Sequence, residues 1–159
     1  LRPHQWRSLW SSAIPLSART VWYRAIYAKL PTKSLLHFRI PHDHLTPHCI
    51  ICSTFTVEDN LHFLFSYPLK LLVWRDMFQS FICSTPFSDA ILLHYLTEIL
   101  FCKGISVDRD TSLPFADLSL RQIFACTLLT IWQAHWRWTF NRTPFLVTSV
   151  SQSLTRSLA

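Results

Sequence analysis

Hydrophobic residues recur at three- and four-residue intervals along most of this 159-residue chain, a spacing typical of amphipathic helices. The longest stripe follows the capping-box pattern Ser119-x-x-Gln122 and ends at Asn141. It predicts a long helix there. Further helices with an apolar stripe are expected at residues 17–30, with Ser17 as N-cap, and at 56–66, 69–82 and 89–101.

The remaining segments carry weaker patterns. Residues 1–12 and the segment after Thr32, through Phe38, predict short helices, and residues 102–114 predict a loop. The Ser- and Thr-rich tail after Phe145 is expected to form a frayed helix or none. No clear strand pattern is present.

The pattern therefore predicts a mainly α fold, an irregular helical array with a small Cys/His zinc-knuckle-like loop. We expect residues 1–85 to form a basic helical lead-in followed by a zinc-binding-like region. Residues 86–159 are expected to form a C-terminal helical extension packed on it, so that the chain makes one compact unit.

Composition narrows the class of protein. Half of the residues are apolar, with 7 Trp and 12 Phe, and only 15% are charged, as in a folded domain with sticky surfaces. The single glycine, Gly104, excludes Gly-rich phosphate loops, dinucleotide fingerprints and Gly-x-Ser-x-Gly nucleophile elbows, because each needs glycine at several positions.

The five cysteines do not predict a disulfide framework. Apart from one Cys-x-x-Cys pair, they stand singly in apolar runs, where a thiol behaves as a small buried hydrophobe. No signal-like segment opens the chain, and its best apolar run, residues 123–132, is too short to cross a membrane. We expect a protein of the nucleus or cytoplasm that is not secreted. Because the chain starts with leucine, we also expect a fragment of a longer reading frame.

The net charge of +6 is unevenly distributed. Residues 1–42 carry seven Lys and Arg and no acidic residue, residues 43–117 carry a net charge of −5, and residues 118–159 carry +4. A basic segment of this kind can contact a phosphate backbone. It can equally be a solvated surface or a surface that docks another part of the parent chain.

Cys49 and Cys52 form the Cys-x-x-Cys pair, and His62 follows at short range. Two thiols and an imidazole at this spacing are three plausible ligands of one zinc ion; two partly buried thiols are the alternative. A closed structural site needs four ligands, but Tyr67 stands just before Pro68, and a phenol seldom binds zinc. The other candidates for the fourth ligand are His42, His44, His48 and Cys83.

The candidate catalytic residues have simpler structural explanations. Phe115-Ala116-Asp117-Leu118 is one carboxylate short of a polymerase turn, and Asp108 and Asp110 read as turn residues. Cys126 and His135 lie on an apolar helix stripe, which indicates core packing. Glu58 is expected to cap the helix that carries His62 or to place a charge at its start. We therefore expect no catalytic site.

Several of these motifs together resemble the zinc-binding domain that follows the polymerase domain in reverse transcriptases of non-LTR (LINE-type) retrotransposons. The central part of the resemblance is Cys49-x2-Cys52, Glu58, His62, Pro68 and Val73-Trp74. The upstream part is Trp10, Trp22-Tyr23-Arg24 and Leu30-Pro31-Thr32-Lys33, and the downstream part is Trp132-x2-His135-Trp136-x-Trp138. The family has a cysteine as fourth ligand just before the proline, where this chain has Tyr67.

The resemblance implies a non-catalytic accessory region that helps an upstream reverse transcriptase domain hold RNA or DNA. Zinc would be bound by Cys49, Cys52 and His62. The nucleic-acid contacts would come from Arg19, Arg24, Lys29, Lys33 and Arg39. The Trp-rich helix, with Arg137 and Arg142, could stack bases or pack against a hydrophobic neighbour. The alternative function is a metal-free helical protein-interaction domain or a decayed mobile-element remnant.

Overall fold

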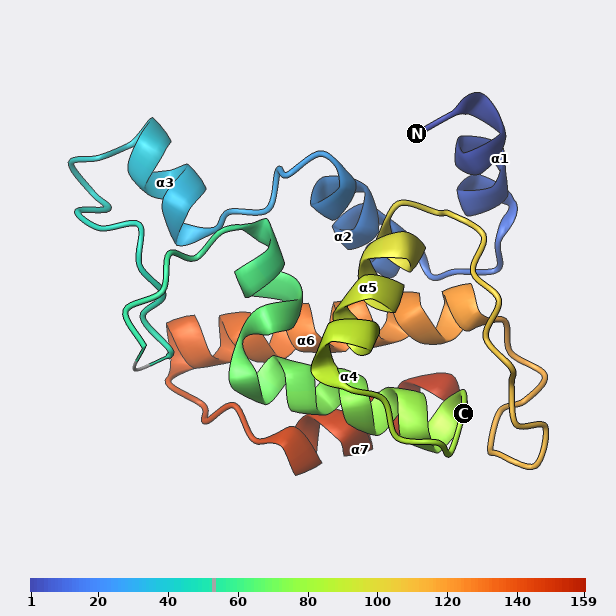
Figure 1. Ribbon diagram of the computed structural model, residues 1–159. Helices are drawn as coiled ribbons and strands as arrows, with labels where there is room; N and C mark the ends of the chain where they lie inside the picture. Colours follow the sequence, from blue (N-terminus) through green and yellow to red (C-terminus); the bar gives the residue numbers. More distant parts are fainter. Residues whose placement is uncertain (53) are drawn as a thin grey trace.

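The computed structural model describes residues 1–52 and 54–159, and its regular structure is helical (Figure 1). The predicted mainly α fold is confirmed. Within the described residues the sole β-type pairing is an isolated antiparallel bridge between His48 and Val57. The helices are α1 (Pro3–Ser11), α2 (Leu16–Ile26), α3 (Lys33–Arg39), the π-helix η1 (His62–Ser66), α4 (Pro68–Phe81), α5 (Asp89–Leu100), α6 (Leu120–Asn141) and α7 (Val147–Leu158).

The long helix α6 lies at the centre of the helical packing. It contacts α2, α4, α7 and η1, and the buried hydrophobic cluster draws on residues from Leu9 to Leu158. In Figure 1, α6 crosses the middle of the molecule, while α3 and the loop after it project to one side. Helix α3 has no fully buried residue. The loop with the cysteines therefore lies at the margin of the core.

Aromatic rings fill the centre of this core. Trp74 and Phe124 have ring centroids 5.0 Å apart, and Trp22 lies 4.8 Å from Phe124. The buried indole N–H of Trp22 donates to the carbonyl of Leu100, and that of Trp74 donates to Leu64, each at 2.8 Å. Both indoles are thus buried with their polar atom satisfied, as a stable core requires.

Local sequence signals correctly placed several helix starts. Ser119 and Gln122 form the predicted capping box at the start of α6. Thr32 caps α3 and Ser88 caps α5, each accepting a backbone N–H of the first turn. Helix α6 ends at Asn141, and its C-cap Arg142 has a left-handed φ of 56°.

The prediction for α2 was wrong at both ends. The helix begins at Leu16 with Pro15 as N-cap, so Ser17 lies in the first turn instead of capping it. Proline has a preset φ and no N–H to satisfy, which suits a helix start. The helix ends at Ile26 because Ala28 adopts a φ of 49° and the N–H of Lys29 donates to the carbonyl of Arg24 at 2.8 Å, a Schellman-type closure.

Two further predictions need correction. The helix expected over residues 56–66 begins at Asn60, because Thr56 and Glu58 pair with Cys49 and Pro47 instead. The tail does form a helix, α7, which buries Val150, Leu154 and Leu158 against α4 and α6. Its apolar stripe was present in the sequence but was diluted by serine and threonine.

The face of α4 also differs from expectation. Leu72, expected in the core, is 43% exposed, while Lys70 is fully buried. Lys70 lies one turn before the buried Trp74 on the same face of the helix, so a lysine faces the core. No helix of the described residues is long and apolar enough to span a membrane.

Candidate metal centre and basic surface

Cys49, Cys52 and His62 come together in space. Their candidate ligand atoms all lie within 4.8 Å of one another, and Cys52 Sγ lies 3.5 Å from His62 Nε2. With the Zn–S and Zn–N distances of protein sites, a tetrahedral zinc would separate a sulfur and a nitrogen ligand by about 3.6 Å. The distance between Cys52 and His62 therefore suits two ligands of one zinc ion, and Cys49 lies close enough to join them.

The loop that carries the cysteines is fixed by backbone pairing across its base. The N–H of Cys49 donates to the carbonyl of Thr56, and the N–H of Glu58 donates to the carbonyl of Pro47, both at 2.9 Å. Cys52 accepts a hydrogen bond from the Thr54 hydroxyl at 3.2 Å. A short two-stranded turn of this kind holds both thiols toward η1, as a metal knuckle requires.

His62 is placed by a helix cap that the sequence reading missed. The carboxylate of Asp59 accepts a hydrogen bond from the backbone N–H of His62 at 2.7 Å. This bond satisfies a donor at the helix start, and the negative charge interacts favourably with the helix dipole. The position of Asp59, three residues before His62, was a sequence signal for a helix N-cap. Glu58 was expected in this role.

Replacing Asp59 with alanine should lower the free energy of unfolding by about 1 kcal/mol, because the helix cap is lost. The Asp59 side chain is exposed, so no packing in the core is lost with it. Asp59→Asn should keep most of the stability, since asparagine caps as well. Urea titration in a chelator separates the two. Equal losses for both variants would show that the carboxylate charge, and not capping, matters.

Glu58 caps a different helix. Its Oε1 accepts the backbone N–H of Lys33 at 2.9 Å, and its carbonyl accepts the N–H of Ser34 at 3.2 Å, at the start of α3. The expected capping role is therefore found on α3 and not on the helix of His62. Through these bonds the buried Glu58, 2% exposed, ties the basic lead-in to the metal loop.

The π-helical turn brings Tyr67 beside His62. The N–H of Tyr67 donates to the carbonyl of His62 at 3.2 Å, an i→i+5 bond that puts the two residues one turn apart. The rings meet edge-on with centroids 6.1 Å apart. Burial raises the pKa of the Tyr67 phenol, and the two thiols raise it further. Tyr67 thus lies beside His62 as a neutral phenol.

The other candidate ligands lie in different surroundings. His44 Nδ1 is 3.5 Å from the ammonium of Lys33, and the ring of His48 packs on Phe55. In the part of the chain that the structure describes, the sole group of three or more metal-binding side chains is Cys49, Cys52 and His62.

The protonation of the site follows from its burial. Burial raises the pKa of the Cys49 thiol to about 12 in the metal-free protein, and Glu58 adds to that effect. Burial also acts on Cys52, but hydrogen bonds, chiefly from Thr54, outweigh it and lower its pKa. Burial lowers the pKa of His62, which keeps the imidazole in the neutral form that binds metal. A metal would displace the thiol protons.

A buried Lys70 lies behind the site. Its ammonium donates to the carbonyl of Phe63 at 2.5 Å and to His135 Nδ1 at 3.2 Å, and lies 4.2 Å from the centre of the Phe63 ring. Burial lowers the pKa of Lys70 to about 8, although Glu58 and the thiols oppose the shift. Burial, with the charge of Lys70, lowers the pKa of His135 to about 2. His135 is therefore a neutral acceptor.

This pair was missed by sequence reasoning. His135 was expected only as a core residue, and Lys70 interrupts the stripe of α4. The sequence signal for a buried lysine was the position of Lys70, about one helical turn from both Tyr67 and Trp74, which are buried.

The five basic residues predicted to bind nucleic acid differ in exposure and in the hydrogen bonds that they already make. Arg24, Lys29 and Arg39 are exposed. Arg19 donates to the carbonyls of Ser12 and Ile14, at 2.9 and 3.3 Å, and so closes the turn between α1 and α2. Lys33 is half-buried beside His44.

The acidic and thiol residues expected to be structural are found in such places. Asp110 accepts hydrogen bonds from the backbone and hydroxyl of Ser112, which lower its pKa, and is a turn residue. Cys126 and His135 are buried on α6, nine residues apart, which is about 13 Å along a helix. They cannot act as a nucleophile and its base.

The Trp-rich end of α6 combines packing with an open groove. Trp132 and Trp136 contact the buried ring of Phe63, at centroid distances of 5.7 and 6.4 Å. The same two tryptophans, with Arg137 and Phe140, line a groove of about 480 Å³. The tryptophans therefore pack against a hydrophobic neighbour, as one of the two expectations stated. Whether the groove also stacks bases stays a prediction.

Comparisons with protein-family models, with curated proteins and with solved structures found no match. The inferences about function therefore start from the metal cluster and from the distribution of charge and aromatic rings.

Proposed function

We propose that this chain is a non-catalytic, nucleic-acid-binding accessory region of a retrotransposon reverse transcriptase, with zinc held by Cys49, Cys52 and His62. The observation that carries the proposal is the acid-free basic segment, residues 1–42, followed by a Cys/His cluster whose ligand atoms lie close enough to share one metal ion. Glu58 joins the two parts, since it caps α3 from within the metal loop.

Zinc would serve as a staple. The cysteines lie on a loop at the margin of the core, and His62 lies on η1, which packs on α4 and α6. A shared ion would therefore fix the loop, and α3 with it, against the helical array. The role of the metal is to hold the basic surface in place.

The phosphate contacts are assigned to the basic residues that are free to make them. Arg24, Lys29 and Arg39 are exposed on the lead-in, where no acidic residue of residues 1–42 competes. Each would release counterions from a nucleic-acid backbone. Arg19 and Lys33 contribute charge, but their side chains already hold local structure.

The test is the salt dependence of binding. The purified chain should bind labelled RNA or single-stranded DNA, with an affinity that falls steeply between about 50 and about 200 mM salt. Absence of any salt-sensitive complex with either probe would end the proposal.

The location of the contacts gives a second prediction. The triple variant Arg24→Gln, Lys29→Gln, Arg39→Gln should reduce the slope of log affinity against log salt by about 2 to 3. The matched control removes three exposed arginines of the C-terminal half, Arg137, Arg142 and Arg156, and should leave the slope nearly unchanged. Equal reductions in both variants would indicate a response to total charge alone.

A second candidate function is a metal-free protein-interaction domain, including a decayed mobile-element remnant. It is favoured by large apolar side chains in solvent, such as Phe38, Leu45 and Phe140, each at least 75% exposed. Tyr67 in the fourth ligand position agrees with this alternative as well. Zinc content separates the two functions.

A further inference from the structure

Three aromatic rings form a connected cluster on the outer side of the basic lead-in. Trp6 of α1 stacks on Tyr27, with centroids 5.7 Å apart and planes 12° from parallel. Tyr23 lies 4.9 Å from Tyr27 and 5.7 Å from Trp6. The two tyrosines are 38% and 47% exposed. The rings thus hold one another in fixed orientations while their outer parts remain open to solvent.

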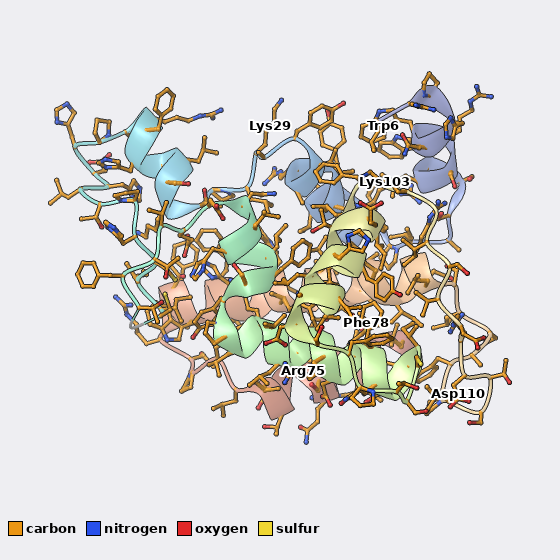
Figure 2. The ribbon with its side chains drawn as sticks, in the orientation of Figure 1. Trp6, Lys29, Arg75, Phe78, Lys103 and Asp110 are labelled. Atoms are coloured by element: carbon orange, nitrogen blue, oxygen red, sulfur yellow. The ribbon has the colours of Figure 1, made fainter. Side chains whose placement is uncertain are left out.

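Cations frame this cluster. The ammonium of Lys29 lies 5.7 Å from the centre of the Tyr27 ring, and Arg24 is exposed between the two tyrosines in sequence. In Figure 2, Trp6 and Lys29 lie along the same edge of the molecule. Residues 1–42 contain no carboxylate. An aromatic face beside a cation matches the two parts of a nucleotide, its planar base and its phosphate.

The cluster is more than the attachment of α1. Helix α1 has other anchors: Leu9 is fully buried, the Gln5 amide donates to the carbonyl of Phe101 at 3.3 Å, and Arg121 donates to the hydroxyl of Ser8. Buried core residues hold α2, namely Ala18, Val21, Trp22 and Ala25. The exposed parts of Tyr23 and Tyr27 are therefore not needed to keep either helix in place.

We infer that Trp6, Tyr23 and Tyr27 form a stacking platform for unpaired bases of a single nucleic-acid strand, whose phosphates meet Arg24 and Lys29. A duplex hides the faces of its bases in its own stack, so the platform selects single strands. This inference rests on the proposed nucleic-acid binding and adds the form of its ligand and the residues that contact the bases.

The test compares two strands that share a backbone. One probe is an oligothymidine of about 12 nucleotides, and the other is the same length of abasic deoxyribose phosphate. Wild-type protein should bind the strand with bases at least about tenfold more tightly. Tyr23→Leu with Tyr27→Leu should bind both strands about equally, with unchanged affinity for the abasic strand and unchanged salt dependence. Leucine keeps the helix and an apolar contact for Trp6, which circular dichroism checks.

Phe140→Ala is the matched control, since it removes an exposed aromatic ring from the Trp-rich end of α6. It should retain the preference for the strand with bases. Equal wild-type affinities for the two strands, or a preference that survives in the tyrosine variant, would overturn the platform while the salt dependence leaves the proposed function standing. Loss of all salt-sensitive binding in the wild type would remove the proposed function and the platform with it.

Discussion

Replacing Tyr67 with cysteine should strengthen zinc binding about a hundredfold or more. Structural zinc sites in peptides gain about 10–16 kcal/mol from four ligands, so one added thiolate contributes roughly 3 kcal/mol. Position 67 is suited to supply it, because the π-helical turn puts it on the side of His62 and near both thiols. Competition with a chromophoric chelator at fixed pH measures the change.

Serine is the matched control for this substitution. Tyr67→Ser leaves the same space as cysteine, beside Phe145 and Lys70, but adds no zinc ligand. Its zinc affinity should stay close to that of the wild type, although its stability falls. Equal zinc affinities for Tyr67→Cys and Tyr67→Ser would show that position 67 does not face the metal.

The metal-free protein should lose about 2 kcal/mol of stability between about pH 7.5 and about pH 5 through His135 alone. The unfolded chain protonates this imidazole below about pH 6.5, whereas the folded protein, in which the pKa of His135 is about 2, does not. The unfolded state therefore binds more protons as the pH falls, and unfolding becomes easier. Urea titrations in the presence of a chelator measure the loss.

His135→Gln isolates this contribution. The glutamine oxygen can still accept from Lys70, but the side chain does not titrate. The variant should lose about 2 kcal/mol less over the same pH range, because the depressed pKa of His62 contributes to both proteins equally. Parallel losses in the two proteins would contradict the neutral, buried imidazole. The alkaline range is less informative, since buried Lys70 and the buried thiols have opposite effects there.

The sequence predicted what depends on neighbouring residues. The capping box at Ser119, the cap at Thr32 and the stripe of α6 are local patterns, and the structure has them. The end of α2 was not predictable in this way, because a non-glycine residue, Ala28, takes the left-handed conformation that closes the helix. No composition signal marks such a residue.

The same distinction between local and long-range features applies to the candidate site. The Cys-x-x-Cys pair and His62 were visible in the sequence, and the structure brings them together. The partners that arrange them were not, because Glu58 reaches Lys33 across 25 residues and Lys70 reaches His135 across 65. The stacked rings of Trp6 and Tyr27 likewise depend on how α1 packs on α2. These contacts are set by long-range packing, which local sequence patterns do not predict.

Zinc content is the most direct test of the proposed metal centre. Protein purified without chelator should contain about one zinc per chain, and Cys49→Ser should lose it. Removal of the metal from the wild type should also loosen the loop after α3 and lower stability. A protein without stoichiometric zinc, whose helicity and stability do not change on adding zinc or chelator, would rule out the metal centre and favour the metal-free interaction domain.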